Sequence, residues 1–198
     1  ISDVAGDDLS TVASGPTVPD PSTFADVREV MQRYGLELPL RLDQSAPETP
    51  KPGDPIFERV ENRLIASAQG SLEAAAAFFR EQGVIPLILS ESVTGEAREV
   101  AKVHAALARQ IRQHGQPLRP PCVLLSGGET TVTVRGTGRG GRNAEFALSL
   151  AVELNGLENV YALAADTDGI DGSEDAAGAL VTPGIWADVG RGEARGYL

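Results

Sequence analysis

The sequence predicts an α/β protein, because apolar stretches of strand length alternate with longer stretches of helical periodicity. Buried strands are expected at residues 84–89, 122–125 and 159–165, and helices between them at residues 94–114 and 142–154. Residues 130–135 instead alternate polar and apolar side chains, which is typical of a strand with one solvated face. The sheet around this strand is therefore expected to be mixed and not purely parallel.

Capping residues and breakers set the other expected elements, taken in chain order. A helix is expected at residues 21–34 with Ser22 as its N-cap, then a short buried strand at residues 64–67. Another helix should run over residues 71–82 and stop at Gly83. Four prolines make residues 43–55 an irregular connection, and residues 116–121 are the best linker candidate. We expect two domains, residues 1–116 and residues 117–198.

Composition excludes several classes of function. The 198 residues carry a formal net charge of −11, which repels nucleic acid and anionic membrane, so neither is an expected partner. No apolar run has the length of a membrane span and no signal peptide opens the chain. The single cysteine, Cys122, forms no internal disulfide, so a cytoplasmic location is expected. Because the chain starts at Ile1, we expect it to be a fragment of a longer protein.

A glycine-rich loop between a strand and a helix, residues 136–141, is the densest functional signal. Glycine lets the backbone approach a ligand, and the following helix offers a partial positive charge at its start. Three guanidinium groups add to this charge, from Arg135, Arg139 and Arg142. The pattern predicts a phosphate site that includes Gly138, Gly140, Gly141 and Asn143. The competing interpretation is a glycine-rich hairpin end with solvated arginines.

The same loop also fits the dinucleotide fingerprint G-x-G-x-x-G, with Asp166 placed where a ribose-binding acid would lie. A nicotinamide-dependent dehydrogenase is therefore a competitor. Against it, the preceding strand alternates polar and apolar residues, whereas the first strand of a Rossmann fold is buried on both faces. The chain has no G-x-x-x-x-G-K-[ST] string, which excludes a P-loop kinase.

Three further groups of residues suit phosphate, metal or proton chemistry. A turn after a buried strand could contact phosphate or a nucleoside, or be a plain hairpin turn; it holds Ser126, Gly127, Gly128, Glu129 and Thr130. Carboxylates after the next strand suit Mg²⁺, or form an acidic surface turn; they are Asp166, Asp168 and Asp171. Asp3 could accept a hydroxyl proton or hold a metal. His104 is expected to pack in the core and His114 to lie at a helix end, so zinc chemistry is poorly supported.

Several strings in one order resemble the glycerate 2-kinases of the MOFRL type. They are Ile1 to Val4, Gly6 to Asp8, Ala13 to Val18, Glu48 to Lys51, Gly95 to Glu99, Leu125 to Thr131, Gly138 to Asn143 and Asp166 to Gly169. The resemblance covers the chain to about Thr182. It implies a Rossmann-like first domain and a mixed-sheet MOFRL domain, both incomplete here.

The resemblance also implies an activity. Members transfer the γ-phosphoryl group of ATP to D-glycerate with Mg²⁺, giving 2-phosphoglycerate. Arg142 would be the essential arginine and Asp3 the acidic residue of the first domain. The family's amino-terminal half, with its active-site lysine, is absent, so the fragment alone is expected to be inactive. Some members are called hydroxypyruvate reductase. A non-catalytic nucleotide-binding module and a possible homodimer also remain open.

Overall fold

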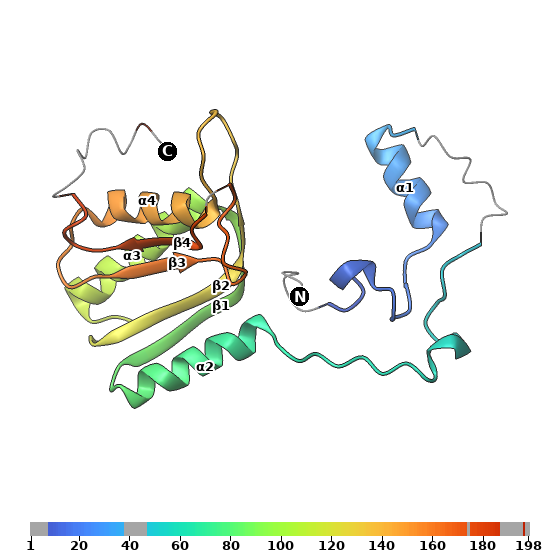
Figure 1. Ribbon diagram of the computed structural model, residues 1–198, viewed down its shortest axis with the longest axis horizontal. Helices are drawn as coiled ribbons and strands as arrows, with labels where there is room; N and C mark the ends of the chain where they lie inside the picture. The colour runs from blue at the N-terminus through green and yellow to red at the C-terminus, as the bar shows by residue number, and fades with distance from the viewer. Residues whose placement is uncertain (1–7, 38–46, 174, 187–195, 197–198) are drawn as a thin grey trace. The chain divides into compact units, whose positions relative to one another are not determined.

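The computed structural model describes residues 8–37, 47–173, 175–186 and 196. The chain forms two compact units, residues 1–67 and residues 68–198, which we describe separately (Figure 1). Asp3, for which the sequence suggests a proton-accepting or metal-binding role, lies outside the described residues, as do Gly6 and Asp7. The expected domain boundary between residues 116 and 117 stays a prediction.

The described residues of the first unit form one α-helix, α1 (Phe24–Tyr34), and two short 3₁₀ helices, η1 (Val12–Ser14) and η2 (Pro55–Phe57). Thr23, and not the expected Ser22, caps α1, because Thr23 and Asp26 form a reciprocal capping box. The strand expected at residues 64–67 is not formed, and Ile65 there is 91% exposed. None of the described residues of this unit is buried.

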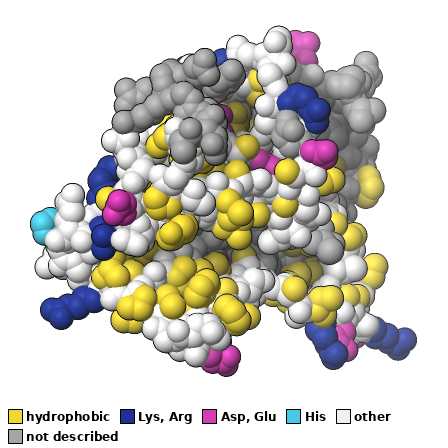
Figure 2. All heavy atoms as spheres, turned by 60° about the vertical axis from the view of Figure 1, so that its left-hand side comes forward, with side chains coloured by type: hydrophobic (Ala, Val, Ile, Leu, Met, Phe, Trp, Pro, Cys, Tyr) yellow, Lys and Arg dark blue, Asp and Glu magenta, His cyan; other side chains and the backbone are white. Residues whose placement is uncertain are grey.

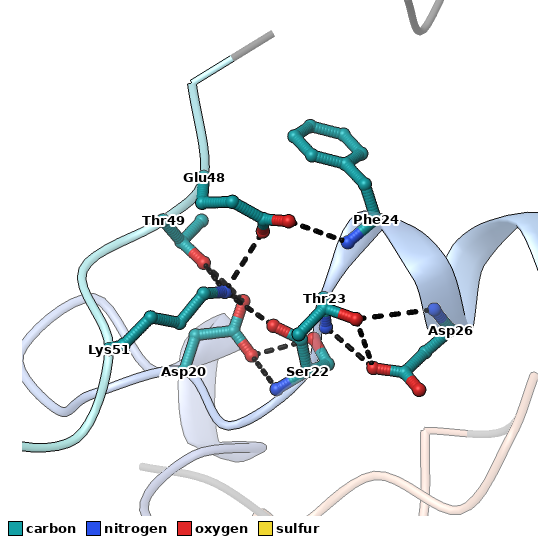
Figure 3. Close-up of polar contacts among 8 residues, drawn as sticks. All are labelled: Asp20, Ser22, Thr23, Phe24, Asp26, Glu48, Thr49 and Lys51. Atoms are coloured by element: carbon teal, nitrogen blue, oxygen red, sulfur yellow. Dashed lines mark hydrogen bonds and ion pairs between the residues drawn. The ribbon is translucent and has the colours of Figure 1, made fainter. Parts of the chain in front are cut away.

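A polar network fastens residues 48–51 to the start of α1 (Figure 3). The Lys51 ammonium donates to the Ser22 carbonyl and to Thr49 Oγ1, and its nitrogen lies 3.1 Å from Glu48 Oε2. Glu48 Oε1 in turn accepts from the amide of Phe24 at 3.1 Å. The connection expected to be irregular is therefore held to the start of α1 through its middle residues, Glu48–Lys51.

Asp20, at the centre of this network, should stay ionised in acid well below the usual range of a carboxyl. Its pKa is lowered from 3.8 to about 2, first by the hydrogen bond from the Ser22 hydroxyl and then by that from Thr49. Because this pKa is depressed in the folded chain, the stabilisation is complete above about pH 4 and is lost as the pH falls towards 2. A carboxyl-carbon NMR titration would measure it. Thr49→Val should move the midpoint towards 3.8, and an unshifted wild-type midpoint near 3.8 would contradict the network.

In the second unit, the part of the chain that the structure describes is a mixed α/β arrangement of three helices and two small sheets (Figure 1). Its elements in chain order are α2 (Ala68–Glu81), β1 (Ile85–Glu96), α3 (Ala97–His114), β2 (Cys122–Thr131), α4 (Arg142–Leu154), β3 (Ala162–Ala165) and β4 (Gly178–Val181). Strands β1 and β2 pair in parallel, and β3 and β4 pair antiparallel. The α/β class predicted from the sequence is confirmed, and parallel and antiparallel pairing both occur; the described sheet that includes Thr130 and Thr131 is the parallel one.

Small side chains build the core of this unit. Helices α3 and α4 pack together, and α4 also packs on β3 and β4. The buried cluster consists of Ala101, Ala105, Ala147, Leu150, Ala151, Leu154 and Val181. Four of these seven residues are alanines, so helix backbones can approach closely, as the scarcity of aromatic residues suggests.

Several element boundaries differ from the prediction, and the strand expected at residues 130–135 is not formed beyond Thr131, where β2 ends. Strand β1 continues to Glu96, so the helix expected from residue 94 begins only at Ala97. The turn expected at residues 126–129 instead lies inside β2, which ends at Thr131. Gly128 explains why a Gly-Gly pair fits in this strand: its φ is +140°, and a Cβ there would overlap the backbone of Val93 across an irregular register.

Candidate functional site

The guanidinium of Arg142 stands at the centre of the candidate site, where three segments meet. Arg142 is the first residue of α4, and its Nη2 donates to Asp166 Oδ1 at 2.7 Å. Its Nη1 is paired with Glu129 Oε1, from β2. The Arg142 side chain is 28% exposed. The structure thus joins one residue from each of three signals that the sequence shows separately.

Asn143 links the carboxylates that follow β3 to the start of α4. Its side-chain Nδ2 donates to Asp166 Oδ2 at 2.9 Å, so Asp166 receives donors from both Arg142 and Asn143. The backbone amide of Asn143 donates to Asp171 Oδ1, also at 2.9 Å. These contacts fix the orientation of the first turn of α4 relative to the loop after β3.

Asp171 acts as the cap of α4 from a distant part of the chain. The N-cap residue itself is Gly141, which has no side chain to accept a hydrogen bond. Asp171 supplies the acceptors instead, because its second oxygen accepts from the amide of Ala144 at 2.7 Å. The residue is only 1% exposed. The positive end of α4, expected to face a phosphate, therefore meets a carboxylate of the protein.

The glycines nearest α4 allow the loop before this helix to pack closely against the loop after β3. A Cβ at Gly141 would overlap the Asp171 carboxylate, and one at Gly172 would overlap the Gly140 carbonyl. Ser173, which the sequence analysis missed, donates its amide to that same carbonyl at 3.1 Å. Cβ atoms at Gly136, Gly138 or Gly140 would meet no atom beyond the loop's own backbone. The outer part of the loop thus remains open to a ligand.

Two of the three arginines, Arg139 and Arg142, have acceptors on the protein. Arg139 Nη2 donates to the Ser173 carbonyl at 2.7 Å. The charge of Arg135 helps to lower the pKa of Glu96, after the hydrogen bonds from Thr133, whereas the pKa of Glu145 is raised, mainly by burial. Glu129, Asp166 and Asp171 balance the guanidiniums near α4. The strong positive potential expected from the sequence is therefore largely compensated in this structure.

The three aspartates expected to hold Mg²⁺ do not all converge on one point, although Asp166 Oδ2 and Asp171 Oδ1 both accept from Asn143 Nδ2, at 2.9 and 3.4 Å. Asp166 faces Arg142 and Asn143, Asp171 caps α4, and Asp168 Oδ1 accepts from the amide of Ile170 at 3.0 Å. Within the part of the chain that the structure describes, no three His, Cys, Asp or Glu side chains are grouped to hold a metal ion. The arrangement seen here does not fit a magnesium site, and the assignment of the ion to these residues stays a prediction.

The remaining candidates of the SGGE string lie along β2. Ser126 is exposed, and its Oγ is hydrogen-bonded to His104 Nε2 at 3.1 Å, a partner that no sequence pattern predicts. Gly127 and Thr130 are within the pairing of β2 with β1, where Thr130 lies opposite Gly95. His104 packs edge-on against Phe146 of α4, at 5.2 Å between ring centroids.

Comparison with known proteins relates the chain to glycerate kinases. Residues 122–196 match the MOFRL family, and residues 1–46 match a domain of unknown function, DUF4147. A D-glycerate 2-kinase of Thermotoga maritima is 41% identical over 91% of this chain and 43% of its own length. A protein of Agrobacterium vitis named "Putative hydroxypyruvate reductase" is 52% identical over 92% of this chain and 42% of its own length.

Solved structures give the same relationship. The crystal structure of glycerate kinase from Thermotoga maritima superimposes with a TM-score of 0.81 at 40% identity, over 92% of this chain and 44% of that one. The chain thus spans less than half of the length of these relatives. No helix in the described ranges is long and apolar enough to cross a membrane. Residues 122–196 therefore match the MOFRL family, and most of the chain is similar to a part of proteins named glycerate 2-kinase.

Proposed function

We propose that the full-length protein is a glycerate 2-kinase, which transfers the γ-phosphoryl group of ATP to D-glycerate and gives 2-phosphoglycerate. One observation carries this beyond the names of the relatives: Arg142 is held rigidly between Glu129 and Asp166, beside an open glycine loop. A guanidinium that is fixed before substrate binds needs no reorganisation when charge develops on a transferring group. Phosphoryl transfer depends mainly on such positioning and electrostatic stabilisation.

Each part of the candidate site has a proposed role in this reaction. Arg142 neutralises charge on the transferring phosphoryl group, while Asn143 and Asp166 keep its side chain in place. The exposed part of the loop, around Gly138 and Arg139, is proposed to contact the phosphates of ATP. Asp3, which lies outside the described residues, is proposed to orient the glycerate 2-hydroxyl or to accept its proton. We also propose that the protein is located in the cytoplasm. The proposed domains are residues 1–116 and residues 117–198.

Mg²⁺ has no step in this mechanism, because the described carboxylates do not converge to hold it. When bound with ATP, the ion would neutralise charge on the β- and γ-phosphates. Asp166, Asp168 and Asp171 would need a different arrangement to reach it.

A nicotinamide-dependent hydroxypyruvate reductase is the second candidate, favoured by the name of the Agrobacterium vitis relative. Two observations weigh against it. Strand β2 ends at Thr131, so the G-x-G-x-x-G string does not directly follow a strand as a dinucleotide fingerprint does. Asp166, the expected ribose ligand, is occupied by Arg142 and Asn143.

One pair of assays on the full-length protein decides between these functions. We expect ADP to form in the presence of D-glycerate and ATP, and no loss of NADH or NADPH absorbance with hydroxypyruvate. Oxidation of the reduced nicotinamide without ADP formation would replace the kinase by the reductase. Binding of ATP with neither turnover would leave a non-catalytic nucleotide-binding module.

A further inference from the structure

His104 of α3 and Ser126 of β2 are hydrogen-bonded across the α3–β2 contact, and the other partner of His104 determines which of the two residues is the donor. His104 Nδ1 lies 2.9 Å from the Val100 carbonyl, one turn earlier in α3. His104 Nε2 lies 3.1 Å from Ser126 Oγ on β2. The rings of His104 and Phe146 pack in a T-shaped arrangement, and a flipped imidazole would present carbons to both hydrogen-bond partners.

The carbonyl partner decides which ring nitrogen carries the proton. A carbonyl oxygen only accepts hydrogen bonds, so Nδ1 of His104 must be the donor in that contact. A neutral imidazole has one N–H, so Nε2 is then left with a lone pair. The Ser126 hydroxyl must therefore donate its single proton to Nε2.

This direction limits what Ser126 can bind. Its only O–H is used by His104, so the exposed side of Oγ presents lone pairs. Phosphate oxygens at neutral pH are also acceptors, and two acceptors gain nothing from contact. We propose that Ser126 binds a donor group of the ligand, a hydroxyl, and not a phosphate oxygen, and that His104 is the positioning residue that enforces this choice. The inference rests on the proposed function and narrows the phosphate-or-nucleoside role first expected for Ser126.

The hydroxyl could belong to either substrate of the proposed reaction, to glycerate or to the ribose of ATP. Substrate analogues distinguish these two sources. 3-Hydroxypropionate lacks the 2-hydroxyl of glycerate, D-lactate lacks the 3-hydroxyl, and 2′-deoxy-ATP or 3′-deoxy-ATP lacks one ribose hydroxyl. Inorganic tripolyphosphate carries acceptors only and serves as the probe of phosphate binding.

The test compares Ser126→Ala with Ser90→Ala in the full-length protein at pH 8.5, because alkaline solution favours the neutral form of an imidazole. Ser90 is the matched control, because it lies opposite Ser126 in β1 and bonds to Ser92 instead. For Ser126→Ala we expect the KM or Kd of one substrate to rise about fivefold, as for one lost hydrogen bond. That rise should disappear with the analogue lacking the contacted hydroxyl, while the affinity for tripolyphosphate stays unchanged.

A second measurement reads the positioning role directly. The ¹⁵N chemical shifts of His104 should show the Nδ1–H tautomer. In His104→Phe, which keeps the ring edge on Phe146, the freed hydroxyl can turn outward and donate, so tripolyphosphate should bind at least as tightly as in the wild type. The proposal is overturned by an Nε2–H tautomer, by equal weakening of tripolyphosphate and ATP in Ser126→Ala, or by no change with any ligand. If the wild type makes no ADP, the kinase proposal fails on its own, and direct binding of ATP against tripolyphosphate still decides the role of Ser126.

Discussion

Replacement of Arg142 by alanine in the full-length protein should lower kcat at least about 100-fold, because a fixed cation at a developing charge commonly contributes ~3–4 kcal/mol. Because two carboxylates hold the guanidinium of Arg142, the site requires the shape of arginine as well as its positive charge. Arg142→Lys should therefore recover little, since an ammonium cannot span both Glu129 and Asp166 as a planar guanidinium does. Steady-state ADP production at saturating ATP and D-glycerate measures the effect.

The matched control for this variant is Arg112→Ala, an exposed arginine in the last turn of α3, which should keep wild-type kcat. Loss of Arg142 leaves Glu129 and Asp166 without the cation between them, so folding has to be checked. We expect circular dichroism to show that Arg142→Ala still folds. If Arg142→Ala keeps kcat within a few-fold of the wild type, Arg142 has a structural role and the proposed mechanism loses its main element.

Replacement of Asp171 by alanine should cost about 2–4 kcal/mol of stability, because it leaves two amides at the start of α4 without acceptors in a buried place. Asp171→Asn keeps one acceptor oxygen and should cost less. Urea unfolding of the full-length protein, followed together with amide hydrogen exchange at Asn143 and Ala144, would locate the loss at the helix end.

Asp168→Ala is the control, since Asp168 is exposed and contacts only the turn that it belongs to; its cost should stay below about 0.5 kcal/mol. This pair also tests the metal hypothesis drawn from the sequence. If Asp171→Ala kept full stability but abolished the dependence of turnover on Mg²⁺, Asp171 would be a metal ligand and not a helix cap.

Periodicity and capping residues were sufficient for the fold class and for most of the helices. The start of α4 at Arg142 follows from the loop glycines before it, and Gly35 and Gly115 end their helices with positive φ. The SGGE segment misled the prediction, because a Gly-Gly pair usually marks a turn. Here glycine is needed at position 128 because the backbone passes close to Val93 of another strand, a long-range contact that no local pattern reveals.

The sequence was sufficient to predict which residues lie in the candidate site, but not which of them contact one another. Arg142, Asn143, Glu129, Asp166 and Asp171 all stand out as polar residues beside glycine or at strand ends. Which carboxylate would cap the helix, and which would hold the arginine, depends on how loops far apart in sequence meet. Ser173 and His104 were missed as partners, because one is an ordinary loop serine and the other lies on an apolar helix face.

The apolar surface of the β3–β4 hairpin affects how the 198-residue chain can be handled. Leu163 and Leu180 lie opposite each other and are 69% and 68% exposed, and Figure 2 shows apolar side chains gathered over much of the visible face. High concentrations of salting-out ions such as sulfate strengthen the association of such surfaces. Purification of this chain by itself therefore calls for dilute solutions of low ionic strength, and ammonium sulfate precipitation is a poor first step.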